Sequence, residues 1–183
     1  SEGPGERFAI WVQGCSIRCP GCCNPEMIPQ SGGEPYRIGK LFSAIVKADV
    51  EGISLLGGEP FDQARGCAAL ARMAREAGMG VMVFTGYTLA QIRTRNEYLG
   101  LLENTDLLKA GPYVERMRST RYRWMGSTNQ QLHFLTGRYR NHPDIAGHHT
   151  QSVTIDFSFG DLTASGWPDF FGSPGAPSES EAR

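Results

Sequence analysis

The sequence has no long apolar run and no excess of charge of one sign. None of its apolar runs approaches the roughly eighteen residues that span a bilayer, so we expect no transmembrane helix. The 18 Lys and Arg residues are balanced by 19 Asp and Glu residues, for a formal net charge of -1. No global field therefore draws the chain to nucleic acid or to an anionic membrane, and we expect neither as a partner.

The opening residues also lack the charged and apolar regions of a signal peptide, so we expect a cytoplasmic protein. The chain has 183 residues, of which 40% are hydrophobic, and this is typical of one globular domain. A chain of this length buries roughly 70% of the surface that its unfolded form exposes. Such a core is stable without disulfides.

The cysteines are few and unevenly placed. Four of the five cysteines, Cys15, Cys19, Cys22 and Cys23, lie close together near the start of the chain. This crowding is unlike the spaced pairs of a secreted disulfide framework. We therefore interpret the segment as a metal site.

Strands alternate with helices along the first two thirds of the chain. Apolar and β-branched stretches predict helices and strands in the order strand, helix, strand, and the same alternation continues beyond them. The expected strands cover residues 7–12, 52–56, 81–85 and 106–110; the expected helices cover 38–49 and 61–77, and a third starts at a Thr88–Gln91 capping box. Alternation of this kind implies an α/β fold with parallel strands, arranged as an open sheet or a partial barrel. Its functional loops gather at the carboxyl ends of the strands.

The last third of the chain has weaker patterns. Residues 116–123 contain four arginines and no regular apolar face, which predicts an exposed loop. Apolar residues alternate with polar ones over 153–159 and predict a last strand at a sheet edge. We expect one domain over residues 1–160, followed by a disordered tail over residues 161–183, where Gly, Pro, Ser and Glu dominate.

The three cysteines Cys15, Cys19 and Cys22 have the spacing C-x3-C-x2-C on one glycine-flanked loop. A structural zinc normally takes four protein ligands, and Cys23 can reach the same ion as its neighbour Cys22 only with strain. Three thiolates suit a [4Fe-4S] cluster, because one iron then stays open to an amine and a carboxylate from a cofactor. The spacing alone leaves a zinc loop and a catalytic cluster as alternatives.

A Gly57-Gly58-Glu59-Pro60 turn follows the second expected strand, just as the cysteine loop follows the first. Two adjacent glycines let a ligand approach the backbone closely, and the Glu59 carboxylate can accept hydrogen bonds from a cationic amino group. Both motifs are expected at one edge of the sheet. Their pairing favours the catalytic cluster over the zinc loop.

These motifs resemble the signature of the radical S-adenosylmethionine enzymes, which have C-x3-C-x2-C after the first barrel strand and a GGE-type turn after the second. Three further segments are similar to the activating proteins of anaerobic ribonucleotide reductase: GPGERFAIWVQGC, VFTGYTLAQI and WMGSTNQQLHFL. The resemblance covers roughly residues 3–135. It implies a partial (βα) barrel of mostly parallel strands.

The resemblance also implies roles for individual residues. Cys15, Cys19 and Cys22 would ligate the cluster, whose open iron would chelate S-adenosylmethionine. The residues implied to contact that cofactor are Gly21, Cys22, Cys23, Gly57, Gly58, Glu59, Thr85 and Gly86. No catalytic side chain is implied beyond the cluster ligands, because the cofactor carries the difficult chemistry.

The implied reaction starts with an electron from a flavodoxin- or ferredoxin-like donor. It cleaves S-adenosylmethionine to methionine and a 5′-deoxyadenosyl radical, which abstracts hydrogen from a glycine of a large partner reductase. Only Cys23 and Cys67 remain beside the three ligands, so we expect a single cluster. The chain departs from the resembled proteins at Cys23, where Tyr or His is usual, and at Ala110, where an acid is common.

Two other functions are compatible with the sequence. The first is a radical S-adenosylmethionine enzyme that modifies a peptide or a small metabolite directly, which Cys23 and Ala110 favour. The second, from another class, is a zinc-stabilised binding module without catalysis, and tetrahedral zinc in place of iron and sulfide would identify it.

Overall fold

The computed structural model describes residues 2–146, 153–158 and 161–166. The chain divides into a unit of residues 2–149 and a second unit that begins at residue 150. The first unit contains strands β1 (Arg7–Val12), β2 (Gly52–Gly57), β3 (Gly80–Phe84), β4 (Leu107–Ala110) and β5 (Gln131–Phe134). Its helices are α1 (Ile38–Lys47), α2 (Ala64–Glu76), α3 (Leu89–Arg93), α4 (Asn96–Glu103) and α5 (Pro143–Ala146), with short 3-10 turns η1 (Pro25–Met27), η2 (Pro60–Gln63) and η3 (Glu115–Met117).

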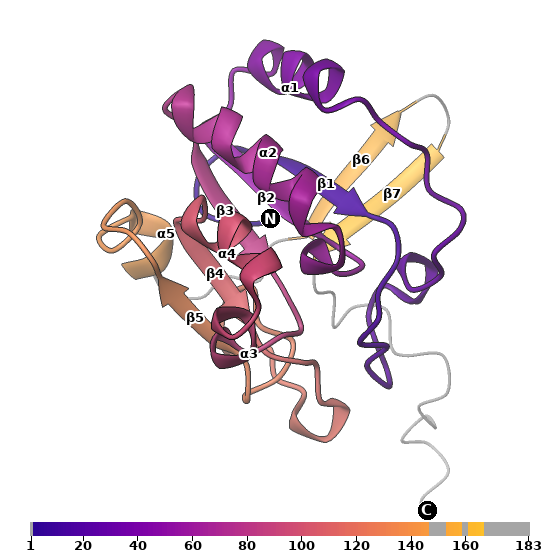
Figure 1. Cartoon of the computed structure of the whole chain (residues 1–183). Coiled ribbons are helices and arrows are strands. Elements are labelled where there is room, and N and C mark those ends of the chain that lie inside the picture. The colour runs from indigo at the N-terminus through magenta and orange to yellow at the C-terminus, as the bar shows by residue number, and fades with distance from the viewer. Residues whose placement is uncertain (1, 147–152, 159–160, 167–183) are drawn as a thin grey trace, which may run out of the picture. The chain divides into compact units, whose positions relative to one another are not determined.

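The five strands of the first unit form one sheet in the order β1-β2-β3-β4-β5 (Figure 1). The pairs from β1 to β4 are all parallel, in registers such as Val12 with Gly57 and Leu55 with Val83. Strand β5 runs antiparallel to β4. The expected α/β fold with mostly parallel strands is therefore confirmed, whereas the sheet is open and does not close into a barrel.

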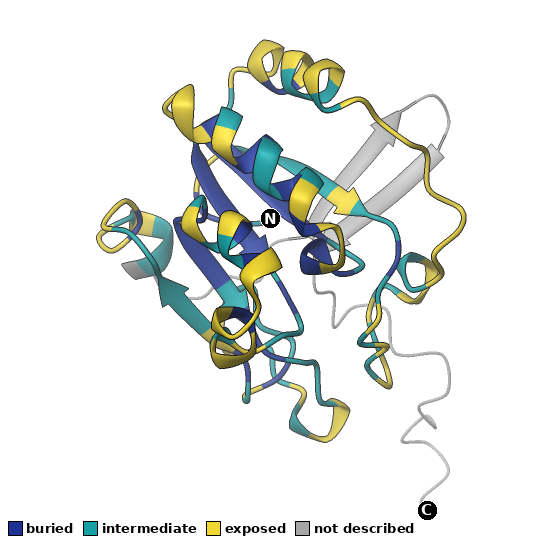
Figure 2. Cartoon of the chain, viewed as in Figure 1, coloured by how far each residue is buried: buried dark blue, intermediate teal, exposed yellow. Residues whose placement is uncertain are grey.

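Helices α1, α2 and α4 cover one face of this sheet (Figure 1). Strands β2, β3 and β4 are buried beneath them, while β1 is only half-buried (Figure 2). Alternate residues of β3 and β4 point into this core, and the residues between them, such as Met82 and Leu107, are buried on the other face. Burial on both faces is why these strands read as continuous apolar runs. The core residues include Ile53, Leu55, Val81, Val83, Leu108 and Ala110 from the strands and Leu70, Ala71, Ala74 and Leu101 from the helices.

The opposite face of the sheet carries a smaller apolar cluster, in which Met82 and Leu107 of the strands pack with Tyr139. At the amino end of β1 the Arg7 guanidinium donates to Ser54 Oγ at 2.7 Å and to the Tyr139 hydroxyl at 2.8 Å. It also donates to the carbonyl of Ile53. Arg7 thus fastens the start of β1 to β2 and to the chain that follows β5.

The second unit contains a two-stranded antiparallel sheet of β6 (Val153–Ser158) and β7 (Asp161–Gly166). A strand was expected at residues 153–159, and β6 provides it, although its partner is β7 and not an edge of the large sheet. Strand β7 lies within the segment expected as a tail, and residues 167–183 lie outside the described residues. Among the helices that the structure describes, none combines the length and the apolar character that crossing a membrane requires.

Candidate metal centre

The cysteine loop and the GGEP turn are joined by backbone hydrogen bonds at the carboxyl edge of the sheet. The Gly58 N–H donates to Val12 O at 2.7 Å, and the Glu59 N–H donates to Gly14 O at 2.9 Å. Gly57 has a φ of +102°, a conformation that favours glycine. A Cβ at Gly58 would meet the backbone of Gly14 and of Met27, so only glycine fits there. The structure therefore brings the two predicted motifs together.

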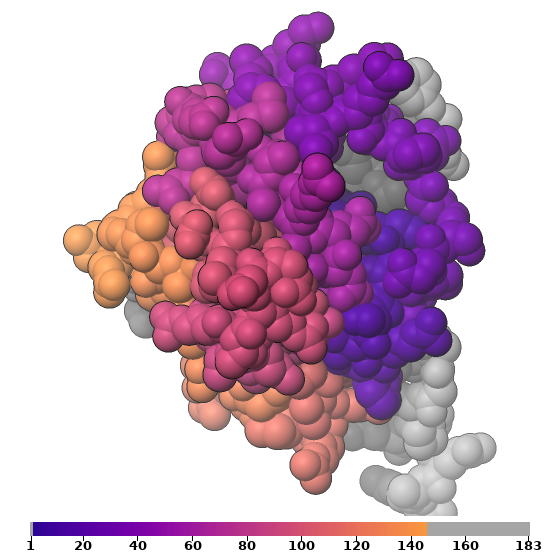
Figure 3. Space-filling view, in the orientation of Figure 1, coloured from indigo at the N-terminus to yellow at the C-terminus, as the bar shows by residue number. Residues whose placement is uncertain are grey.

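From this junction the cysteine loop crosses the carboxyl ends of the neighbouring strands. A Cβ at Gly86, after β3, would lie 2.7 Å from Ile17 Cδ1. Gly21 has a φ of +69°, and a Cβ there would lie 2.9 Å from the Glu115 carboxyl carbon, beyond β4. Figure 3 shows the indigo cysteine loop bordering the magenta start of α2 on the exposed surface. The loop thus lies over the edge where parallel strands present their functional groups.

The three predicted ligands, Cys15, Cys19 and Cys22, are all half-buried and carry free thiols. A turn connects two of them, since Cys22 N–H donates to Cys19 O at 3.2 Å. Burial raises the pKa of Cys15, and the negative charges of Glu59 and Asp62 add to this effect. Within the described residues no three Cys, His, Asp or Glu side chains converge on a single ion.

A cubane cluster does not require the three thiolates to converge on one ion, because each thiolate binds a different iron atom. Three half-buried thiols on one loop at a sheet edge fit that requirement. The remaining cysteines differ from them: Cys23 is exposed beside the loop, and Cys67 is buried in α2. Burial raises the pKa of Cys67 to about 12, so it stays a neutral thiol of the core.

The carboxylate of Glu59 faces inward and is only 1% exposed. Its Oε1 accepts hydrogen bonds from Phe61 N at 2.9 Å and from Thr85 Oγ1 at 2.8 Å, and its Oε2 accepts one from Gly86 N at 2.9 Å. Burial raises the pKa of Glu59 to about 7 despite these bonds. The residue ties the end of β2 to the end of β3, and a further donor can reach it only through Oε2.

Thr85 and Gly86 are held by the same network. The Thr85 hydroxyl is buried, donates to Glu59 and accepts a bond from Tyr87 N at 3.0 Å. The Gly86 N–H is engaged by Glu59 as well. Both residues lie at the predicted edge, and their polar groups position Glu59.

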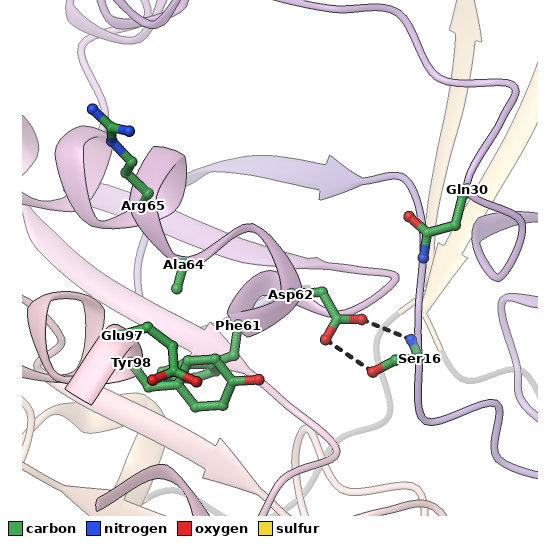
Figure 4. A pocket seen from close by; sticks show the side chains of 8 residues that line it. All are labelled: Ser16, Gln30, Phe61, Asp62, Ala64, Arg65, Glu97 and Tyr98. Carbon is green, nitrogen blue, oxygen red and sulfur yellow. Dashed lines mark hydrogen bonds between the residues drawn. The ribbon is translucent and has the colours of Figure 1, made fainter. Parts of the chain in front are cut away.

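Asp62 is a site residue that the sequence reasoning missed. Its carboxylate accepts hydrogen bonds from Ser16 N at 2.7 Å and from Ser16 Oγ at 2.9 Å, directly after Cys15 (Figure 4). The Tyr87 hydroxyl donates to the same carboxylate at 3.2 Å. Asp62 thereby anchors the cysteine loop to η2. In the sequence it looks like an ordinary acidic residue in the first turn of a helix.

An open cavity of about 500 Å³ lies on the helix side of this anchor. Figure 4 shows Asp62 and Ser16 at its inner wall, with Arg65 and Gln30 on opposite sides of the opening. None of the cysteines lines it. The cavity therefore neighbours the loop but is separate from the thiols.

The GSTNQ segment is hydrogen-bonded to the residues that directly follow β4. Gln130 donates through Nε2 to Gly111 O at 2.9 Å, and Asn129 donates through Nδ2 to Pro112 O at 2.8 Å. Ala110, which departs from the resembled proteins, is buried in the core on the helix-covered face. It consequently lies on the other side of the sheet from Lys109.

Comparisons with known proteins agree with this site. A family described as "4Fe-4S single cluster domain" matches residues 1–133. The chain is 31% identical over 146 residues to an anaerobic ribonucleoside-triphosphate reductase-activating protein of Vibrio cholerae, covering 74% of this chain and 92% of that protein. Proteins of the same name from Escherichia coli K12 and from Enterobacteria phage T4 are 29% and 28% identical, over 73% and 72% of this chain and 92% and 85% of theirs.

Proposed function

This chain belongs to the family of the anaerobic ribonucleoside-triphosphate reductase-activating proteins, and we propose that it is a radical S-adenosylmethionine enzyme that generates a glycyl radical in such a reductase. The resemblance that the motifs indicated is confirmed by the match to these proteins and to a 4Fe-4S single cluster domain. In this proposal the open five-stranded sheet is the partial (βα) barrel of that enzyme class.

One observation carries the proposal. At the carboxyl edge of parallel strands, the GGEP turn is hydrogen-bonded to the end of β1 through Gly58 N and to Gly14, just before the first cysteine, through Glu59 N. A three-thiol loop and a turn with two half-buried glycines then lie where a cluster and an amino-acid cofactor can share one iron. Cys15, Cys19 and Cys22 would hold the cluster.

The proposed contacts with the cofactor lie at the same edge of the sheet. Gly21, Cys22 and Cys23 at the end of the loop, with Gly57 and Gly58, would line S-adenosylmethionine. Glu59 would meet its amino group through the remaining acceptor position of Oε2, while Thr85 and Gly86 keep the Glu59 carboxylate in place. When bound, the reduced cluster supplies the electron that cleaves the cofactor to methionine and a 5′-deoxyadenosyl radical.

The partners follow from the chemistry. A one-electron donor of the flavodoxin or ferredoxin type would reduce the cluster, and the reductase would supply the glycine that loses hydrogen. The chain's own task is to bind and orient the cofactor and to keep water away from it.

The test is electron paramagnetic resonance of an anaerobic ribonucleoside-triphosphate reductase incubated with this chain, S-adenosylmethionine and a reductant. We expect a glycyl radical signal with the wild type and with Cys67→Ala, because Cys67 lies in the core. We expect none with Cys19→Ala, which removes a cluster ligand. Cofactor cleavage without a glycyl radical would contradict the proposed substrate and favour direct modification of a peptide or metabolite.

A further inference from the structure

A lysine stands at the carboxyl end of β4, on the face of the sheet opposite the helix-covered core. Lys109 pairs in register with Phe84 of β3 and with Leu132 of β5. Its strand neighbours Leu108 and Ala110 both belong to the core under the helices, so the Lys109 side chain lies on the other face. There its ammonium nitrogen lies 6.0 Å from the centre of the Phe84 ring.

The ammonium group of Lys109 lies within electrostatic range of the cysteine loop. Burial lowers the pKa of Lys109 to about 8. The opposing electrostatic effect, which raises this pKa, comes from Cys23, Glu59, Cys19 and Cys22. The position is consistent with the path of the loop, which approaches Gly86 after β3 and Glu115 in η3, the turn that follows β4. The backbone is also fixed at this point, since the Lys109 carbonyl accepts a bond from Thr85 N at 2.9 Å.

The ammonium group of Lys109 has no hydrogen bond or ion pair within the part of the chain that the structure describes. Lys109 is half-buried, and an ammonium group that is partly removed from water is usually paired, because desolvating an uncompensated charge costs free energy. The contact with Phe84, at 6.0 Å, is at the outer limit of a cation–π interaction and offsets little of that cost. An apolar side chain would fill the same position without this cost.

The negative charge that would balance Lys109 can come from the thiols with which it interacts electrostatically. A cysteine binds a cluster iron as the thiolate, so Cys19 and Cys22 would carry negative charge as cluster ligands. The site then gains a further unit of negative charge when the cluster takes up an electron. A fixed positive charge nearby favours the reduced state over the oxidised state.

We propose that Lys109 is a charge-compensating, positioning residue of the cluster site, whose ammonium group makes the cluster easier to reduce. This inference rests on the proposed function. One electron passes from the external donor to the cluster, no covalent bond forms or breaks, and Lys109 keeps its proton. The residue acts through the cluster and need not touch the substrate.

The test is a redox titration of the reconstituted cluster, monitored by electron paramagnetic resonance at neutral pH. Lys109→Met keeps the length of the side chain and removes the charge. We expect the ratio of reduced to oxidised cluster at a given ambient potential to fall roughly tenfold, which is about 59 mV for a one-electron couple. Lys109→Arg restores the charge and should restore the wild-type midpoint, and Lys40→Met, on the exposed surface of α1, should leave it unchanged.

An unchanged midpoint in Lys109→Met, with iron content equal to the wild type, would overturn this role. An unchanged midpoint with weaker binding of S-adenosylmethionine would also overturn it and assign Lys109 to the carboxylate of the cofactor. If Lys109→Met takes up no cluster, the same redox titration is made with Lys109→Gln, which also removes the charge. Failure of the wild type itself to take up a cluster would instead overturn the proposed function, on which this inference depends.

Discussion

At the scale of single residues, Glu59 holds together the edge on which the site is built. Three donors, one in η2 and two in the residues that follow β3, converge on a carboxylate that is 1% exposed. Burial nevertheless raises its pKa to about 7, because desolvation of the anion outweighs the three hydrogen bonds. The folded chain therefore binds a proton at Glu59 over a pH range in which the unfolded chain has lost it.

This difference makes stability depend on pH. The pKa of Glu59 rises from 4.5 to about 7 on folding, so its contribution is fully present below pH 4.5 and is lost as the pH rises through 7. The loss is about 3 kcal/mol at 1.36 kcal/mol per pKa unit. We expect urea unfolding of the cluster-free chain to show this decline between pH 5 and pH 8, and Glu59→Gln to flatten it. Parallel pH profiles for the two proteins would contradict the raised pKa.

The sequence could predict which residue types gather at the site but not the direction in which they point. The GGEP turn predicted that the Glu59 carboxylate can accept hydrogen bonds from a cationic amino group, and the structure shows that carboxylate bonded to Thr85 and Gly86 as well. Asp62 was not singled out at all. Both facts depend on which donors the fold brings within 3 Å, and such long-range pairing leaves no periodic signal along the chain.

At the scale of elements, the turn after β2 determines the path of the cysteine loop. Gly58 leaves no room for a side chain against the backbone of Gly14 and Met27. Gly58→Ala should therefore displace the loop, at a cost of about 1–3 kcal/mol, although it removes no ligand. We expect most of the iron to be lost, measured as iron and sulfide per chain after anaerobic reconstitution.

Gly66 provides the matched control. It lies in α2, and a Cβ there would meet no atom within 4 Å. Gly66→Ala should keep the full iron content and raise stability by roughly 0.5–1 kcal/mol, because alanine loses less backbone freedom on folding into a helix. Equal iron contents in Gly58→Ala and Gly66→Ala would show that the turn does not shape the loop.

The elements that the sequence predicted share strong local signals. Strand β1 was predicted at its observed bounds, because RFAIWV is apolar and a glycine follows soon after it. The Thr88–Gln91 capping box also forms as predicted and opens α3. Strand β5 was not predicted, since its four residues are too few to show alternation and its partner β4 lies more than twenty residues earlier.

At the scale of the whole molecule, function follows from the parallel order of β1 to β4. Parallel strands place their carboxyl ends at one edge, so loops that are far apart in the sequence meet there. The alternation of strands and helices was sufficient to predict this meeting. It left an open sheet and a partial barrel as alternatives, because closure depends on strand tilt and stagger, which the sequence pattern does not encode.

The central claim is that this edge holds a cluster that cleaves S-adenosylmethionine. The most direct measurement is the yield of 5′-deoxyadenosine after anaerobic reconstitution with iron and sulfide, in the presence of dithionite and S-adenosylmethionine. We predict formation of 5′-deoxyadenosine that disappears when Cys15, Cys19 or Cys22 is replaced by alanine and persists in Cys67→Ala. Binding of zinc in place of a cluster, or product that survives loss of these three thiols, would contradict the account.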